Sequence, residues 1–195
     1  DEYTLSTPYD STTVSSSKTK ATTGVAGDKN GLSFNDDGTK MYVVGTSGAG
    51  QGVLNESTLT TAFDVSTASS VNTEVITGAD VPTGLTFNND GTKMFVTDNS
   101  TNNIVSFELA TPYDTTELGT SATTAVGSSE TGPEDLTFNA DGTKMFVVGS
   151  SGNSIYEYSL STAFDLSTSS ATGSLDIGGE ETEVSSITFN ADGSK

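Results

Sequence analysis

Four copies of one short polar turn carry the residues best suited to binding a cation. The turn reads Asn-x-Asp-Gly-Thr/Ser-Lys, and its carboxylates are Asp37, Asp90, Asp141 and Asp192. Oxygen ligands at this density resemble part of a calcium loop, but the bidentate Glu that closes an EF-hand loop is missing. Asn, Asp and Gly are also the residues of a tight β-turn. The sequence therefore favours a hairpin turn and no resident cofactor, with Ca²⁺ as the alternative.

A second recurring element places an aromatic ring beside a carboxylate in every unit. It reads Pro-Tyr-Asp or Ala-Phe-Asp, with the ring at Tyr9, Phe63, Tyr113 and Phe164. Such pairs could bind glycans, because sugar faces stack on rings and sugar hydroxyls bond to carboxylates. Alternatively, the ring fills the edge between adjacent units while the Asp caps the following Ser/Thr turn. We favour the structural interpretation and predict that these four rings are repeat-interface aromatics.

Two sequons offer sites for covalent modification. They are Asn55-Glu56-Ser57 and Asn99-Ser100-Thr101, and both fall in segments that the sequence predicts to be loops. Asn55 and Asn99 are therefore candidate glycosylation sites, provided that the chain passes through a secretory pathway.

The residues most often used in catalysis are missing. The chain has no His, no Arg and no Cys, so thiolate chemistry is excluded and acid/base work would fall to carboxylates and Tyr. The acidic residues show no cluster specific to one unit, whereas a catalytic site normally breaks the symmetry of a repeat. The sequence therefore predicts no catalytic residues and no enzyme, and a carboxylate-based hydrolase ranks only third among the hypotheses.

The elements that position these residues repeat with the same period. The anchoring aromatics are Phe34, Phe87, Phe138 and Phe189, which are 53, 51 and 51 residues apart. A period near 50 is typical of β-propellers and related arrays. The acidic, Ser- and Thr-rich composition alone would also fit disorder, but a disordered chain would not place Phe, Met and Tyr at the same phase of each repeat.

One unit serves as a template for the strands. Alternating apolar residues predict a strand at 136–138, a tight turn at 139–144, a doubly buried strand at 145–148, a third strand at 156–160 and a weaker fourth at 172–177. The first unit departs from this template, because polar residues occupy its third-strand positions, and we expect its outer half to be irregular. The predicted fold class is all-β: tandem four-stranded antiparallel units forming a β-propeller or a propeller-like array.

The segment at 84–107 carries a family resemblance. Its sequence, Gly-Leu-Thr-Phe-Asn-Asn-Asp-Gly-Thr-Lys-Met-Phe-Val-Thr-Asp-Asn-Ser-Thr-Asn-Asn-Ile-Val-Ser-Phe, resembles the YVTN-type β-propeller repeat of microbial surface and secreted proteins. The added Ser-Thr-Ala/Pro-Phe/Tyr-Asp element lengthens the unit beyond the usual period of that family. The resemblance implies a propeller scaffold, on which the family carries binding, structural and occasionally enzymatic members.

The units divide a single repeat domain, 1–195. We expect a partial unit at 1–30, full units at 31–83, 84–134 and 135–184, and a partial unit at 185–195. The two partial units together lack a second strand, which would leave backbone groups of two strands unpaired. Three interpretations follow: the chain is a window of a longer array, a neighbouring chain completes the unit, or four units close with a gap.

Charge limits the partners. A net charge of −19, from 26 acidic residues and 7 lysines, repels nucleic acid and anionic lipid, and no apolar run is long enough for membrane insertion. We therefore predict an extracellular or cell-surface microbial module that is structural and non-enzymatic, assembling end to end with itself into an array or filament. The alternative is an adhesive module that binds other surface proteins or glycans.

Overall fold

The computed structural model describes residues 2–8, 10–19, 27–181, 183–190 and 193–194 of the chain. These residues form strands joined by turns, together with three 3-10 helices of one turn each, η1 (Ser11–Thr13), η2 (Val65–Thr67) and η3 (Leu166–Thr168). The described strands make three four-stranded sheets and one two-stranded sheet, all antiparallel. The predicted fold class is confirmed: the chain is an all-β protein of repeated four-stranded units in a propeller arrangement.

Each four-stranded sheet is one repeat unit whose strands follow one another in chain order. The first unit contains β3 (Lys29–Phe34), β4 (Lys40–Thr46), β5 (Gly52–Leu59) and β6 (Ala68–Val75). The second contains β7 (Pro82–Phe87), β8 (Lys93–Asp98), β9 (Asn103–Leu109) and β10 (Leu118–Ala125). The third contains β11 (Pro133–Phe138), β12 (Lys144–Gly149), β13 (Ser154–Leu160) and β14 (Ser169–Asp176).

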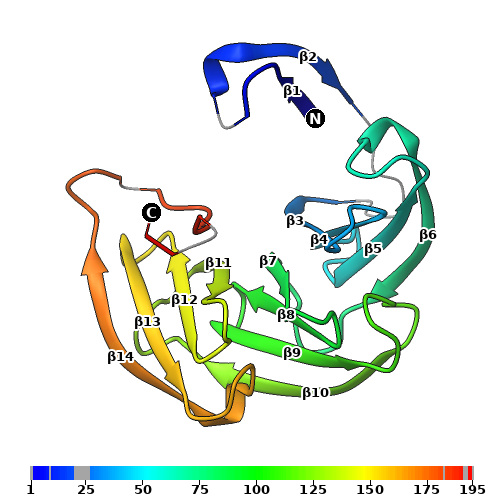
Figure 1. Cartoon of the computed structure of the whole chain (residues 1–195). Helices are drawn as coiled ribbons and strands as arrows, with labels where there is room; N and C mark the ends of the chain where they lie inside the picture. The colour runs from blue at the N-terminus through cyan, green and yellow to red at the C-terminus, as the bar shows by residue number, and fades with distance from the viewer. Residues whose placement is uncertain (1, 9, 20–26, 182, 191–192, 195) are drawn as a thin grey trace.

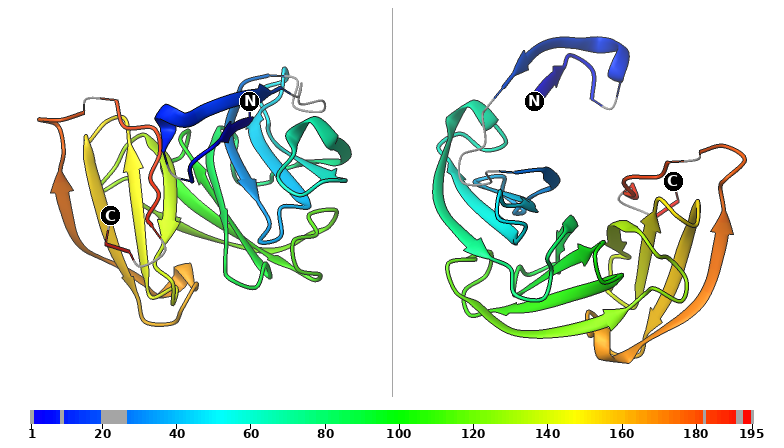
Figure 2. Two further views of the ribbon diagram at one scale, coloured as in Figure 1. Left: turned by 45° about the horizontal axis from the view of Figure 1, so that its top comes forward. Right: turned by 180° about the vertical axis from the view of Figure 1, so that it is seen from behind.

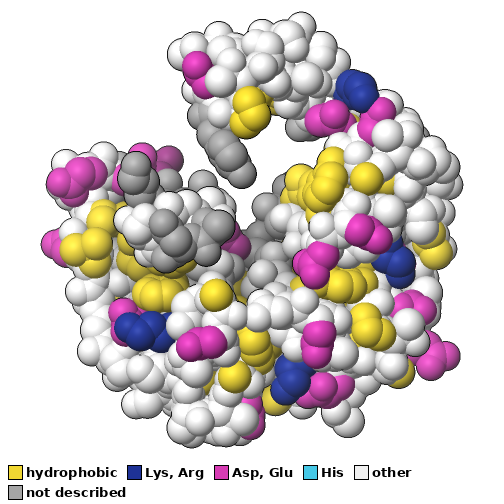
Figure 3. All heavy atoms as spheres, viewed as in Figure 1, with side chains coloured by type: hydrophobic (Ala, Val, Ile, Leu, Met, Phe, Trp, Pro, Cys, Tyr) yellow, Lys and Arg dark blue, Asp and Glu magenta, His cyan; other side chains and the backbone are white. Residues whose placement is uncertain are grey.

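The sheets stand around a central opening like blades (Figure 1). The first strand of each unit (β3, β7, β11) lies innermost and the fourth (β6, β10, β14) outermost. The ring is open: a hairpin of β1 (Glu2–Leu5) and β2 (Val14–Lys18) lies on one side of the gap and the C-terminal segment on the other (Figures 1 and 2). Acidic side chains are scattered over the face seen in Figure 3, with few lysines among them.

The first hairpin of each unit shows why the repeated sequence folds this way. Phe138 pairs with Met145 across the turn between β11 and β12, and the other two units repeat this register. Gly142 in that turn has a φ of +70°, a conformation that side chains with a Cβ rarely adopt. The Asp-Gly step in the sequence therefore sets the reversal, and the reversal sets which residues face each neighbouring sheet.

The core lies between the sheets. One cluster, including Tyr42, Leu54 and Met94, fills the space between the first and second units. A second, including Phe95, Ile104 and Met145, fills the space between the second and third. Because each sheet is covered on both faces only where it has two neighbours, the second unit is the best buried of the three.

The first unit is regular, so the expectation of an irregular outer half is wrong. Its third strand, β5, runs unbroken and pairs with both β4 and β6. Asn55 sits inside this strand and donates through Nδ2 to Ser70 Oγ, the Asn72 carbonyl and Thr73 Oγ1. The polar residues that made the segment look loop-like are therefore satisfied by the neighbouring strand.

The end segments differ from the full units. The hairpin β1–β2 corresponds to the third and fourth strands of a unit, and it contacts the first unit through Glu2 Oε2, which accepts from the Val65 N–H at 2.8 Å. At the other end, the described residues 183–190 correspond to a first strand but have no strand partner there. No helix among the described residues is long and apolar enough to cross a bilayer.

Candidate functional site

Two adjacent acidic residues, Glu134 and Asp135, lie near the start of β11, the innermost strand of the third unit. Counting four residues back from each anchoring Phe gives Asn30, Thr83, Glu134 and Ser185 at the start of the innermost segment. The next residue is Asp135 in the third unit and Gly or Ser in the others. The third unit therefore has two acidic residues at positions where the other units have none.

Glu134 lies between two turns of neighbouring units. Its Oε1 accepts a hydrogen bond from Asn99 Nδ2 at 3.0 Å, in the β8–β9 turn, and from Ser150 Oγ at 3.4 Å, in the β12–β13 turn. Its side chain is partly buried, and among the ion pairs of the described residues it has no lysine partner. Burial raises the pKa of the Glu134 carboxyl, the Ser150 hydrogen bond opposes the shift, and the charge of Glu130 adds to it.

Glu130 binds the backbone of the turns next to this site. It is 1% exposed, and its two carboxylate oxygens accept from the N–H groups of Gly132 (2.9 Å), Ser151 (3.2 Å) and Gly152 (3.0 Å). Three backbone donors satisfy a buried carboxylate without a cation. Glu130 thereby fixes the turn that carries Ser150 against the start of β11.

Asp135 is used to join units. Its Oδ1 accepts from the Leu136 N–H at 2.9 Å, and its Oδ2 accepts from Ser186 Oγ at 2.7 Å and the Ile187 N–H at 3.1 Å. These contacts tie the third unit to the innermost segment of the following one. Of the three acids, Glu134 alone has a carboxylate oxygen, Oε2, that accepts no hydrogen bond from the described residues.

Buried hydroxyls and a buried carboxylate hold the backbone of this site. Thr83 Oγ1 donates to the Pro133 carbonyl at 2.8 Å, and Thr97 Oγ1 donates to the Glu134 carbonyl at 3.3 Å. Asp98, at 0% exposure, accepts from the Val81 N–H at 2.9 Å and so fixes the turn that carries the neighbouring Asn99. The arrangement presents a half-buried carboxyl, an amide and a hydroxyl on rigid supports, which is a set able to transfer a proton and to bind a hydroxylated ligand.

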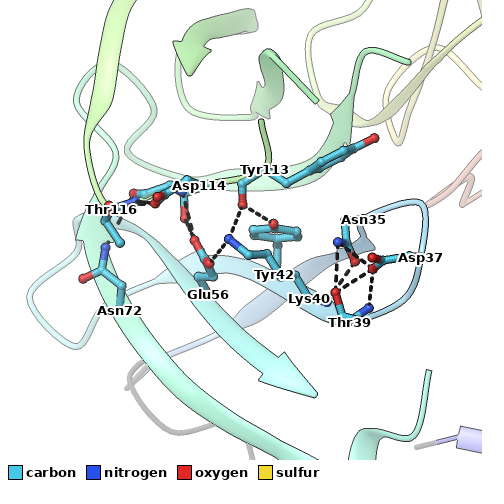
Figure 4. Close-up of polar contacts among 11 residues, drawn as sticks. Asn35, Asp37, Thr39, Lys40, Tyr42, Glu56, Asn72, Tyr113, Asp114 and Thr116 are labelled. Atoms are coloured by element: carbon cyan, nitrogen blue, oxygen red, sulfur yellow. Dashed lines mark hydrogen bonds and ion pairs between the residues drawn. The ribbon is translucent and has the colours of Figure 1, made fainter. Parts of the chain in front are cut away.

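In a second polar cluster, between the first and second units, the charged groups are already paired. Glu56 is 2% exposed and accepts from Lys40 Nζ at 2.7 Å, from the Thr115 N–H at 2.9 Å and from Thr115 Oγ1 at 2.8 Å. Lys40 Nζ and the Tyr42 hydroxyl both donate to the Tyr113 carbonyl (Figure 4). Burial, then the charge of Glu56, raises the pKa of Tyr42. Every charged group here is paired inside a packed interface, so the cluster is structural.

The recurring Asn-x-Asp-Gly turns keep their carboxylates occupied. Asp37, Asp90 and Asp141 each accept the backbone N–H of the Thr two residues later at 2.9 to 3.0 Å, and its hydroxyl as well. These hydrogen bonds lower the pKa of all three carboxyls. In the part of the chain that the structure describes, no three acidic side chains converge as a metal ion would need. Asp192 lies outside the described residues.

The predicted interface aromatics lie over the glycines of these turns. Phe63, Tyr113 and Phe164 have φ between +56° and +59°, and their rings are so close to the turn glycines that a Cβ there would come within 2.4 Å of a ring carbon. Each ring also packs on the anchoring Phe of its own unit, with centroids 5.2 to 5.5 Å apart. Tyr9 lies outside the described residues.

The two sequons differ in accessibility. Asn55 lies within β5 at 1% exposure rather than in a loop, so the expected loop placement is wrong and a glycan there is incompatible with the fold. Asn99 lies in a turn, but its amide nitrogen already donates to Glu134. A glycan on Asn99 would replace one of the two hydrogens of this nitrogen and place a sugar next to the contact with Glu134.

Comparison with known proteins places the chain by fold. No protein-family model matches it, and no curated protein is similar in sequence. A Bacteroides uniformis protein provisionally assigned as a 6-phosphogluconolactonase superposes with a TM-score of 0.65 at 13% identity, covering 98% of this chain and 54% of that one. The periplasmic gluconolactonase of Pseudomonas aeruginosa gives 0.60 at 18% identity, covering 87% and 49%.

A third match is the β-propeller domain of Myceliophteria thermophila Cps50, with a TM-score of 0.53 at 16% identity, covering 81% of this chain and 45% of that one. The chain thus spans about half the length of the structures it matches. At these identities the likeness establishes a β-propeller fold. The YVTN-type resemblance stays a prediction.

The same comparisons contradict the expectation of a non-enzymatic structural or adhesive module. Three of the matched structures carry lactonase names, and a further one is a luciferin-regenerating enzyme. The absence of His and Arg does not exclude catalysis, because one unit carries a carboxylate at a position where the others have none. Aligning the repeats on their anchoring Phe residues is the signal that would have found Glu134.

Proposed function

We propose that this chain belongs to a β-propeller hydrolase that opens neutral sugar lactones, with the Glu134 carboxylate as general base. The observation that carries the proposal is the environment of this one carboxyl. It is half-buried near the start of β11, the innermost strand of its unit, has no cationic partner among the described ion pairs, and has a raised pKa. Raised carboxyl pKa values in such positions are typical of catalytic acids and bases. The lactonase names among the structural neighbours support the reaction class.

The chemistry needs one group that carries a proton in both directions. The Glu134 carboxylate takes a proton from water as the water oxygen bonds to the lactone carbonyl carbon. The ring C–O bond then breaks, and the same proton passes to the departing alkoxide, leaving an open-chain hydroxy acid. Asn99 and Ser150 orient the carboxylate through Oε1 and leave Oε2 for the water.

Charge favours a neutral substrate over a phosphorylated one. The chain carries a net charge of −19 and has no Arg, the residue that most often clamps phosphate. Lys40, Lys93 and Lys144 are engaged with Glu56, Glu108 and Glu157 away from Glu134. A polyhydroxylated neutral ring would instead find an amide, a hydroxyl and a carboxylate.

The test is lactone hydrolysis by the purified chain, measured with glucono-1,5-lactone in a pH-stat against spontaneous hydrolysis. We expect hydrolysis above the spontaneous rate and a loss of about 10²- to 10⁴-fold in kcat/KM for Glu134→Gln, the range for removal of a general base. Glu108→Gln is the matched control, since Glu108 lies on β9 and is 54% exposed. The control should keep full activity.

The pH profile adds a second readout. Because a general base acts only when ionised, the rate should fall as the pH drops through the raised pKa of Glu134. A rate no faster than the spontaneous reaction, or an unchanged rate and profile in Glu134→Gln, would refute the proposal.

A further inference from the structure

The two complete contacts between units are built on three rings each. One ring comes from the second strand, one from the anchoring Phe of the next unit, and one from the aromatic turn of that next unit. Between the first and second units these are Tyr42, Phe87 and Tyr113, with adjacent centroids 4.7 and 5.2 Å apart. Between the second and third units Phe95, Phe138 and Phe164 repeat the arrangement at 4.6 and 5.2 Å.

The backbone of the aromatic turn is also bound in each contact. Lys40 Nζ donates to the Tyr113 carbonyl at 2.8 Å, and Lys93 Nζ donates to the Phe164 carbonyl at 3.4 Å. In the first contact, Glu56 Oε2 accepts the N–H of Thr115, two residues after the ring. The same lysines lie near the Asp that follows the ring, and their charge contributes to the lowered pKa of these carboxyls. Each unit therefore binds the aromatic turn of the next unit through a space that holds the ring (the slot), through a lysine and, in the first contact, through a glutamate.

The hairpin β1–β2 contacts the aromatic turn of the first unit in a similar way. Glu2 Oε2 accepts from the Val65 N–H, two residues after the Phe63 ring, and Lys18 pairs with Asp64. The glutamate contact thus occurs at two places in the molecule, with Glu2 and Glu56 at the same position of the third strand.

The third unit carries the same receiving groups, and among the described residues no further four-stranded sheet packs against them. We define the open face as Lys144, Phe146, Glu157 and Phe189. Phe146 packs on Phe189 with centroids 4.8 Å apart, and Lys144 pairs with Glu157 at 2.8 Å. Phe146 is only partly buried, whereas its counterparts Tyr42 and Phe95 are 0% exposed.

Two adjoining cavities lie at the open face. One of about 600 Å³ is lined by Lys144, Phe146, Phe189 and Gly193, and an adjoining one of about 410 Å³ reaches Glu157. Gly193 has the φ of +70° shared by the turn glycines that lie under Tyr113 and Phe164. The slot thus has the lining that holds a ring in both complete contacts.

We propose that the open face binds the aromatic turn of a further repeat unit of this kind: a Phe or Tyr followed by Asp, as at Phe164–Asp165. Lys144 would donate to the carbonyl of the incoming aromatic and attract its Asp, while Glu157 would accept the N–H two residues after the ring. No existing ion pair has to break, because Lys40 holds Glu56 and the Tyr113 carbonyl at the same time. The turn therefore adds contacts to groups that are already in place.

The test extends the full chain after Lys195 by a second copy of residues 145–176, which would supply the strands and turn of the next unit. We expect backbone amide exchange at Phe146 and across 186–190 to slow by at least about tenfold, or about 1.4 kcal/mol against local opening. An otherwise identical extension with Ala in place of the copied Phe164 is the matched control and should lose most of this protection. In the Phe extension, Lys144→Gln should lose part of it.

Three outcomes would overturn the proposal. The extension could leave exchange unchanged, the Ala extension could protect as well as the Phe extension, or the unextended chain could form a dimer that Phe189→Ala dissolves, as measured by light scattering. The last would make a second copy the occupant of the open face. None of these readouts depends on hydrolytic activity, so this proposal and the hydrolase proposal fail independently.

Discussion

Among the glutamates that lie partly or wholly out of water, Glu56 and Glu134 have opposite surroundings. Glu56, between the first and second units, is 2% exposed and is paired with Lys40 and Thr115. Glu134, near the start of β11, is half-buried, and its hydrogen-bond donors among the described residues are the neutral Asn99 and Ser150. A buried carboxylate that is fully paired stabilises the packing of the two units around it. A desolvated carboxylate that lacks a counter-ion has a raised pKa, which suits it to proton transfer.

The largest effect should come from breaking the paired glutamate. Glu56→Ala would leave Lys40 at an interface with only the Tyr113 carbonyl to bind, and breaking a buried pair typically costs about 3 to 5 kcal/mol. Urea unfolding followed by circular dichroism measures the change in the free energy of unfolding. The matched control is Glu157→Ala, which removes the equivalent residue from an exposed pair with Lys144 and should cost about 0 to 1 kcal/mol. Equal losses in the two variants would show that burial does not separate these pairs.

The capped aspartates form a third class of carboxylate, exposed but hydrogen-bonded. Hydrogen bonds from the neighbouring Thr or Ser lower the pKa of Asp37, Asp90, Asp114, Asp141 and Asp165 below the ordinary 3.8. A depressed folded-state pKa stabilises the fold above the unfolded value and loses that contribution as pH falls. The contribution of these carboxyls to thermal stability should therefore be constant above about pH 5 and decline below pH 4. Asp90→Asn should shrink the decline, and a melting temperature independent of pH down to pH 2 would contradict the prediction.

Much of the fold could be predicted because the same strand and turn pattern recurs in each repeat. The Asp-Gly step and the alternation around Phe138 set a hairpin whose register the structure reproduces. The prediction failed at Asn55, where polar residues in β5 looked like a loop. Their partners lie on β6, fifteen or more residues away, so local composition could not reveal that the amide is satisfied.

The site was missed for a different reason. Glu134 is one of 26 acidic residues, and composition does not separate it from the others. Its character comes from burial at the start of β11 and from Asn99, which belongs to the preceding unit. Comparing equivalent positions among repeats would have singled it out, but the raised pKa depends on packing that only the structure shows.

A smaller loss of stability should follow when a hydroxyl is removed from the Glu56 cluster and its ion pair is kept. Tyr42→Phe removes the hydroxyl that donates to the Tyr113 carbonyl, while Lys40 still donates to the same oxygen. Since the acceptor stays satisfied, the loss should be about 1 kcal/mol, that of one hydrogen bond. The second unit carries Phe95 at this position, so the ring itself fits the site. A urea-unfolding loss as large as that of Glu56→Ala would mean that the hydroxyl, rather than the ion pair, holds the interface.

The smallest change in stability, and one of opposite sign, should come from Glu134→Gln. A raised folded-state pKa means that the protonated carboxyl is favoured in the fold, so this residue's contribution is fully present below the unfolded pKa and is lost as pH rises through the folded one. Gln keeps the acceptor for Asn99 and Ser150 but carries no charge. The variant should therefore match the parent at pH 4 and exceed it at pH 7, by at most about 1 kcal/mol because the group is partly exposed to solvent. Paired thermal melts at the two pH values measure this difference. A variant less stable than the parent at pH 7 would mean that the ionised carboxylate stabilises the fold, which would place Glu134 with Glu56 as a structural charge.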